Sequence, residues 1–299
     1  MDIAKEIKRL KEEKGAIILA HYYTLPEIQE IADDVGDSYY LSKKGKESPC
    51  ETIVFCGVEF MAESAKLLSP EKKVLFPNER ATCSMVEAID LDEVKKLVEQ
   101  HKDSILVSYI NSSTELKAIS YTCCTSSSAE KIIESIEGKK ILFVPDKNLG
   151  EYISEKFPDK EFILWDGFCC VHHHIMAEDV LHEKNKYPEA KVLVHPECRK
   201  EVRDLADYVG STRGIIDYAT EDSCDEFIIV TDVGVFYELE KRNPLKKFHA
   251  LPMVCDNMKL TTLEDVYSCL KEGTNEVFIP KELARKAVKS LEMMHSLAE

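Results

Sequence analysis

Short apolar runs along the chain alternate with stretches in which apolar residues recur every three or four positions. The runs at residues 16–20 and 52–56 are rich in Ile, Val and Ala, which is typical of strands buried in a parallel sheet. Between them, residues 26–36 have an apolar face, Pro26 near the start and Gly36 at the end, so we expect a helix there. Strands that alternate with helices in this way predict an α/β protein in which helices cover parallel sheets.

The same order of elements recurs three times. Three short apolar strands are each followed by a turn and a cysteine, and these cysteines, Cys83, Cys169 and Cys255, are spaced 86 residues apart. A fixed interval between similar segments indicates a repeated structural unit. We therefore expect three consecutive α/β/α units, each of βαβαβ order. The boundaries predicted from the cysteines are 1–83, 84–169 and 170–255.

The last part of the chain, residues 256–299, has no unit of its own. It contains a helical pattern from about residue 280 to residue 297. Because a helix of this kind must bury its apolar face against other elements, we expect this segment to pack back on the first unit.

Polar side chains follow the first strand of every unit. Ligands of open α/β sheets bind at the carboxyl ends of the strands. If the three units face one another through these ends, their polar side chains and the three cysteines converge on one central site. The polar residues are His21 and Tyr23 in the first unit, Tyr109 and Asn111 in the second, and His195 and Glu197 in the third.

Composition excludes several classes of partner. The 299 residues carry a net charge of −16, and such a chain is repelled by nucleic-acid phosphates and by anionic lipid. No apolar run approaches the roughly 20 residues of a membrane span, and the first 15 residues lack the apolar core of a signal peptide. We expect a cytoplasmic protein with no nucleic-acid or membrane partner.

Eleven cysteines are many for such a protein. The number is odd and no secretory signal precedes them, so metal or cluster ligation is a better interpretation than disulfides. No CxxC pair occurs, hence any ligands come from distant parts of the chain. Three thiolates can hold a zinc ion, or a [4Fe–4S] cluster that keeps one iron open as a Lewis acid. Cys170 competes with Cys169 as a ligand, and the repeat spacing favours Cys169.

Two other polar segments allow two interpretations each. Adjacent residues of the run His172 to His174 cannot all face one ion, so this run is either a surface tract or contributes only His172, which forms a CxxH pattern with Cys169. The loop at residues 123–128 is either a plain polar loop or an anion site at the start of the helix that follows. No GxGxxG, HExxH or GxSxG motif is present, so nucleotide binding and the common hydrolase sites have no support.

Several motifs in this order resemble the quinolinate synthase family, the "A" protein of NAD biosynthesis. The resemblance extends from about residue 17 to residue 279. It implies three α/β/α units in a pseudo-threefold arrangement around one [4Fe–4S] cluster per chain. It also implies condensation of iminoaspartate with dihydroxyacetone phosphate to quinolinate, with an upstream aspartate-oxidising enzyme as supplier. The motifs are AHYYTLPEIQEIADDVGDS, YINSS, CTSSSA, PDKNLG, GFCCVH, HPEC and CDNMK.

The resemblance also implies roles for individual residues. The cluster ligands are Cys83, Cys169 and Cys255. The catalytic residues are His21, Tyr23, Tyr109 and Glu197. The substrate-binding residues are His21, Ser38, Tyr109, Asn111, Ser126, His172, His195, Glu197, Ser211 and Thr212. The chain departs from the family pattern at Thr114, Ser128, Cys170 and Asp232.

Two alternatives of other classes remain open. A non-enzymatic iron–sulfur sensor would need a partner surface or a DNA-binding element, and the sequence has no basic helix or helix-turn-helix. A zinc-dependent aldolase or hydrolase would use the same three thiolates. Because the family's substrates are anions and the chain is acidic, we also expect the site itself to be locally positive.

Overall fold

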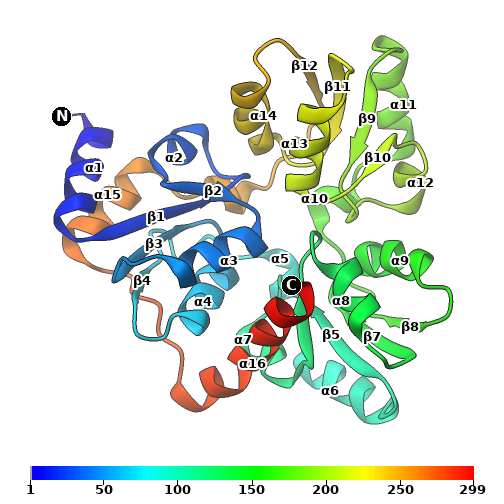
Figure 1. Ribbon diagram of the computed structural model, residues 1–299, viewed down its shortest axis with the longest axis horizontal. Helices are drawn as coiled ribbons and strands as arrows, with labels where there is room; N and C mark the ends of the chain where they lie inside the picture. The colour runs from blue at the N-terminus through cyan, green and yellow to red at the C-terminus, as the bar shows by residue number, and fades with distance from the viewer. Residues whose placement is uncertain (1) are drawn as a thin grey trace.

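The computed structural model describes residues 2–299 and contains three four-stranded sheets in which all paired strands are parallel. The sheets come from consecutive parts of the chain and surround a common centre, with the first unit in blue, the second in green and the third in yellow (Figure 1). The largest apolar core includes Tyr22, Phe143 and Phe227 from the three units. The predicted α/β fold with three units is confirmed, whereas the boundaries 1–83, 84–169 and 170–255 stay a proposal.

In the first unit the strand order is β2-β1-β3-β4. The central strand β1 is almost entirely buried, as its apolar sequence predicts. The strands are β1 Ala16–His21, β2 Asp34–Gly36, β3 Thr52–Cys56 and β4 Lys73–Leu75. The helices are α1 Ile3–Glu13, α2 Pro26–Ile31, α3 Ser38–Glu47 and α4 Glu59–Leu68.

The other two units repeat this topology, with strand orders β6-β5-β7-β8 and β10-β9-β11-β12. The second has strands β5 Ile105–Tyr109, β6 Thr122–Cys124, β7 Lys140–Val144 and β8 Glu161–Leu164, and helices α6 Leu91–Gln100, α7 Thr114–Ile119, α8 Ala129–Ser135 and α9 Lys147–Lys156. The third has strands β9 Lys191–Val194, β10 Tyr208–Val209, β11 Glu226–Val230 and β12 Lys247–Ala250, and helices α11 Ala177–Lys186, α12 Lys200–Arg203, α13 Thr212–Glu221, η1 Val233–Val235 and α14 Phe236–Arg242.

Each unit has one strand more than the βαβαβ pattern predicted. The additional strands β2, β6 and β10 are only two or three residues long, too short to show a period of their own. The predicted helix over 26–36 is therefore wrong in its second half, because α2 ends at Ile31. The Asp33 carboxylate accepts a hydrogen bond from the backbone N–H of Ile18 at 2.8 Å, and the next residues pair with β1.

A short helix begins directly after each of the repeated cysteines. These helices are α5 Ser84–Glu87, α10 Cys170–His173 and η2 Asp256–Lys259. Cys83, Cys169 and Cys255 are the residues that precede the first turns. The three cysteines thus occupy the same place in three copies of one local structure.

The two last helices take different positions. Helix α15, Leu263–Glu272, packs against α1 of the first unit, as expected for this segment. Helix α16, Lys281–Ala298, lies mainly against α7 and β6 of the second unit and also contacts α4 of the first (Figure 1). The expectation that all of 256–299 packs on the first unit is therefore wrong for α16.

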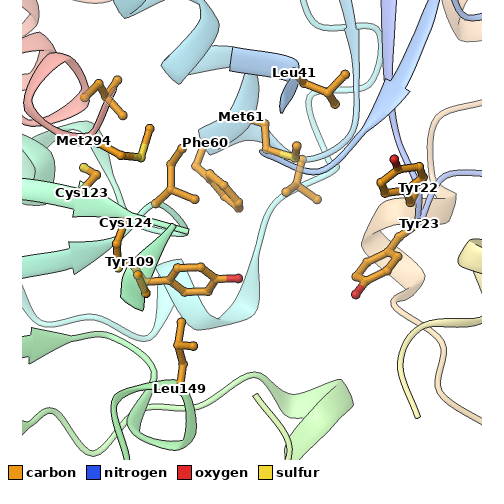
Figure 2. Packing of buried hydrophobic residues seen from close by; sticks show 14 of the residues in the cluster. Tyr22, Tyr23, Leu41, Phe60, Met61, Tyr109, Cys123, Cys124, Leu149 and Met294 are labelled. Carbon is orange, nitrogen blue, oxygen red and sulfur yellow. The ribbon is translucent and has the colours of Figure 1, made fainter. Parts of the chain in front are cut away.

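The apolar face of α16 explains this position. Its buried residues include Ala287, Leu291 and Met294, which join the same core as Ile132 of α8, and Figure 2 shows Met294 close to Cys123 of β6. The helices over this edge of the second sheet, α7 and α8, have only six and seven residues. They leave apolar surface that α16 covers. No helix within residues 2–299 combines the length and the apolarity needed to cross a membrane.

Candidate active site

Three sets of corresponding residues come together from the three units. His21, Tyr109 and His195 stand at the carboxyl ends of β1, β5 and β9, and two residues further on come Tyr23, Asn111 and Glu197. A third set, Ser38, Ser126 and Thr212, stands at or just before the first turns of α3, α8 and α13. Within every set the intervals are 88 and 86 residues. Each unit therefore supplies three chemically different residues, and the units supply them at equivalent positions of the repeat.

All nine of these residues line one small cavity of about 50 Å³. Figure 2 shows two of them, Tyr23 of the first unit and Tyr109 of the second, with their rings turned toward the space between the units. The convergence expected from the repeat is thus present. The cavity is also lined by Asp37, Phe60, Thr125 and Met258.

The helix ends around this cavity are capped by side chains. The Asp37 carboxylate accepts a hydrogen bond from the N–H of Tyr40 at 2.9 Å at the start of α3. Ser211 does the same for Gly214 at 3.1 Å at the start of α13. Ser211 is therefore a capping residue that does not line the cavity, whereas its neighbour Thr212 does. Helix N-termini attract anions through their free N–H groups and the helix dipole.

The side-chain charges differ from the expectation of a positive site. Within residues 2–299, no Lys or Arg lines the small cavity, and the charged groups that do are Asp37 and Glu197. That expectation is wrong for the side chains. The N-termini of α3 and α13 carry a positive partial charge near this cavity, and at α3 the Asp37 carboxylate opposes it.

A second cavity of about 260 Å³ adjoins the first and is lined by all three repeated cysteines. The two cavities share Tyr23, Asn111 and Glu197. Of these two cavities, Cys170 and His172 line only the larger one. His172 is buried, while His173 stacks on Phe168 with ring centroids 3.9 Å apart and His174 is exposed. Only the first histidine of the run thus faces the site.

The spacing of the sulfur atoms bears on the kind of metal site. A single zinc ion binds thiolates at about 2.3 Å, which brings their sulfurs to about 3.8 Å from one another. Within the described residues, the only three potential ligand atoms that all lie within 4.8 Å of one another belong to Cys169, His172 and Glu197. The three cysteines are spread more widely around one cavity, and this arrangement fits a larger group than one ion.

Glu197 lies at the centre of a buried hydrogen-bond network. Its Oε2 is 3.0 Å from Nδ1 of His172 and 3.4 Å from Nδ1 of His195. Burial acts to raise the pKa of Glu197, but the hydrogen bond and charge of His172, together with His195, leave that pKa below its ordinary value. Glu197 is consequently an ionised carboxylate that accepts protons.

Two histidines and two tyrosines of the site are held neutral. Burial lowers the pKa of His21 to about 3, with Lys259 adding to the effect, and lowers that of His195 to about 3, with His172 adding. Burial also raises the pKa values of Tyr23 and Tyr109 well above 10. Near pH 7 these side chains therefore act as uncharged hydrogen-bond donors and acceptors.

Four residues with contacts at the site were not singled out as functional by the sequence analysis. Asp146 and Asp232 accept hydrogen bonds from the backbone N–H groups of Cys169 and Cys255. Lys259 binds Asp232 at 2.6 Å and the carbonyl of Tyr23. Thr231 contacts His172 and Tyr23. The one available signal was that the two aspartates are themselves 86 residues apart.

Comparisons with known proteins give the family. The model of the family described as quinolinate synthetase A protein matches residues 5–296. The chain is 54% identical over 301 residues to a quinolinate synthase from Clostridioides difficile, with 100% of this chain and 99% of that protein covered. It is 47% identical over 304 residues to one from Sulfurihydrogenibium sp., with 99% of each covered. The chain therefore belongs to the quinolinate synthase family, whose members are enzymes of NAD biosynthesis.

Proposed function

We propose that this enzyme condenses iminoaspartate with dihydroxyacetone phosphate to form quinolinate, phosphate and two molecules of water. One carbon–carbon bond and one carbon–nitrogen double bond form, and phosphate leaves. The observation that carries the proposal is the convergence of nine polar residues from three units on one cavity beside three cysteines. The family resemblance supplies the identity of the substrates.

Anion binding follows from the helix ends. The substrates carry two carboxylates and a phosphate, and such groups bind well to hydroxyls and to helix N-termini. Ser38, Ser126 and Thr212 present hydroxyls at this edge of the cavity. Asn111 adds an amide whose NH₂ group can donate to an anion, while its buried Oδ1 has no hydrogen-bond partner within residues 2–299. We assign these four residues to the anionic groups, and we assign Ser211 to holding Thr212 in place through its cap.

Proton transfer is assigned to the other side of the cavity. Glu197, ionised and buried, is the general base that takes protons from substrate carbon or nitrogen. Tyr23, Tyr109 and His21 are neutral, so they hold substrate oxygen or nitrogen atoms by hydrogen bonds and pass protons. His172 and His195 orient the Glu197 carboxylate, since both lie within 3.4 Å of its Oε2. The enclosed cavity excludes water that would hydrolyse an imine.

The residues present fit an iron–sulfur cluster. Cys83, Cys169 and Cys255 would hold one [4Fe–4S] cluster per chain, and Asn111, Tyr23 and Glu197 would face it from the shared wall of the two cavities. The open iron of such a cluster supplies Lewis-acid chemistry toward a substrate oxygen. The wide spacing of the cysteines supports this assignment over zinc.

The supply of substrate and the location in the cell follow from chemistry. Iminoaspartate is unstable in water, so an enzyme that oxidises aspartate has to deliver it. All eleven cysteines are unpaired, and free thiols and exposed clusters persist in reducing compartments. We therefore propose that the enzyme acts in the cytoplasm.

The test is an anaerobic purification with iron, sulfide and zinc analysis, followed by a quinolinate assay with both substrates. About four irons and four sulfides per chain, together with quinolinate, support the proposal. Zinc without iron would favour an aldolase or hydrolase. A complete cluster without product would overturn the proposed substrates and favour a sensor.

A further inference from the structure

Lys117 of α7 is a completely buried lysine beside the small cavity. Its Nζ donates a hydrogen bond to the backbone carbonyl of Ser112 and lies 5.5 Å from the ring centroid of Phe60. Phe60 and Asn111, the neighbour of Ser112, both line the small cavity. Lys117 itself lines neither of the two cavities, so its ammonium lies one layer behind the wall that Phe60 and Asn111 form.

The partners of this ammonium are unusually few. Two other basic residues between positions 2 and 299 are buried, Lys72 and Arg203. Arg203 forms ion pairs with two glutamates of α9, and Lys72 donates to three backbone carbonyls. Lys117 has one carbonyl and one aromatic ring for its three N–H donors. Since buried charges are ordinarily paired, Lys117 has positive charge to offer to another group.

The surroundings of Lys117 favour its charged form. A carbonyl oxygen and the face of an aromatic ring both attract an ammonium. Burial lowers the pKa of Lys117, and the charges of Cys123 and Glu63 oppose that decrease. Charges also act more strongly on one another in the protein interior than in water, because the effective dielectric constant is lower there.

Two other basic side chains influence residues of the small cavity, and each has a carboxylate partner. Lys259 binds Asp232 at 2.6 Å, and Arg213 lies 3.4 Å from Asp217. The two charged groups that line the cavity are carboxylates. In the part of the chain that the structure describes, Lys117 is therefore the buried cation near this cavity that has no carboxylate partner.

We propose that the ammonium of Lys117 supplies the positive potential that holds anionic substrate groups in the small cavity. The phosphate or carboxylate is held by the hydroxyls and by the amide of Asn111, and Lys117 attracts it through the wall without contact. Because Lys117 touches no reacting atom, its charge affects binding and leaves the chemical step unchanged. The inference rests on the proposed function for the identity of the anion.

The test separates the charge of Lys117 from its hydrogen bond. Lys117→Met removes both, whereas Lys117→Gln removes the charge and keeps an N–H donor for the Ser112 carbonyl. The matched control is Lys72→Gln, because Lys72 is also buried, also donates to carbonyls and lines neither cavity. Calorimetry on the anaerobic, cluster-loaded proteins gives Kd for inorganic phosphate and for dihydroxyacetone phosphate. Iron content, thermal midpoint, kcat and KM are measured on the same samples.

We expect both Lys117 variants to bind inorganic phosphate about tenfold more weakly. This is the scale of one unit charge that acts on another over roughly 10 Å at an effective dielectric constant of about 20. KM for dihydroxyacetone phosphate should rise by a similar factor, while kcat stays within about twofold and iron content is normal. Lys72→Gln should bind phosphate normally.

Three outcomes overturn the inference. Normal phosphate affinity in Lys117→Gln would show that the hydrogen bond to Ser112 matters and the charge does not. Loss of iron in both Lys117 variants, but not in Lys72→Gln, would show a structural role. An unmodified enzyme that binds no phosphate would leave the charge of Lys117 without an anion to hold.

Failure of the proposed function gives a different result. If phosphate affinity follows the charge of Lys117 but iminoaspartate and dihydroxyacetone phosphate give no quinolinate, the inference holds and the proposed function is wrong. If quinolinate forms with normal KM in both Lys117 variants, the proposed function holds and the inference is wrong.

Discussion

The backbone N–H of Cys169 donates a hydrogen bond of 2.8 Å to the carboxylate of Asp146, the residue that follows β7 by two positions. The third unit repeats this contact, with Cys255 donating to Asp232 at 2.6 Å. The same carboxylates also accept from the first turn of the next helix, at Leu149 and Gly234. In the first unit the corresponding residue is the apolar Val58. An aspartate therefore holds the backbone of two of the three cysteines, and the first unit has no aspartate at that position.

Replacing Asp146 by Asn tests the importance of this support. Asparagine has a single acceptor oxygen, so it cannot accept from both Leu149 and Cys169, and its NH₂ group would face one of the two donors. Mutation of a group that holds a metal ligand by a hydrogen bond typically lowers metal affinity 10- to 100-fold. We expect the cluster to be lost at least about tenfold faster to a chelator, followed by its visible absorbance.

The matched control is Asp90→Asn. Asp90 caps α6 through the N–H groups of Asp92 and Glu93 and touches no cysteine, so cluster loss should keep its normal rate. Equal rates in the Asp146 and Asp90 variants would show that the contact to Cys169 has no effect on the cluster.

Replacing Cys83, Cys169 or Cys255 singly by Ser should abolish both cluster and activity, because each is proposed to supply one of three thiolates. The measurement is iron and sulfide per chain after anaerobic reconstitution. Cys50→Ser is the control, since Cys50 lies outside both cavities and should retain the full cluster. Full retention in all three ligand variants would refute the assignment.

Replacing Glu197 by Gln should leave a folded protein with its cluster and lower kcat by about 10²-fold or more, the usual contribution of a general base. Steady-state kinetics at saturating substrates provide the measurement. The conservative control is Glu189→Gln on the exposed surface, which should not change kcat. Near-normal turnover of the Glu197 variant would remove this carboxylate from the mechanism.

Acidification should weaken the docking of α16 through His295. Nε2 of His295 lies 3.0 Å from Oγ of Ser42 on α3, and burial lowers its pKa to about 4, with Lys46 adding to the effect. Between pH 4 and the ordinary value near 6.5, the unfolded chain binds the proton more tightly than the folded one. The free energy of unfolding therefore falls with falling pH, by up to about 1.4 kcal/mol per pH unit for this group.

The test compares urea unfolding at pH 7 and pH 5 in the unmodified protein and in His295→Gln. Buried carboxylates such as Asp37, whose pKa is raised, act in the opposite direction, so only the difference between the two proteins isolates His295. The variant should lose less stability between the two pH values. His174→Gln, at an exposed position, is the control, and an unchanged pH slope in His295→Gln would contradict the prediction.

The sequence predicts the parts of this molecule that are encoded by repetition. Cys83, Cys169 and Cys255 show the three units, and the polar residues after the first strands show where the units meet. The edge strand Tyr208–Val209 could not be predicted, because two residues carry no period. Likewise, the position of α16 depends on apolar surface left uncovered in the second unit. The sequence of α16 itself does not indicate which unit offers that surface.

The same limit explains the residues that were missed at the site. The spacing of Asp146 and Asp232 could have indicated them, but only the structure shows that their carboxylates face the backbone of the cysteines. Thr231 has no such counterpart, since the residue 86 positions before it is Pro145. Its contact with Tyr23 exists only because two units meet in space.

The helix α15 that packs on α1 is the opening helix of a fourth repeat, since α6, α11 and α15 each have ten residues and start 86 residues apart. Lys14 of the chain's beginning donates to the carbonyl of Lys271, and Leu75 pairs with Glu276. The segment after the third unit thus packs on the first unit, and the three units form a closed ring. On the ribosome, where domains generally fold as they emerge, the first unit is synthesised first but can be completed only after α15 and Glu276 appear.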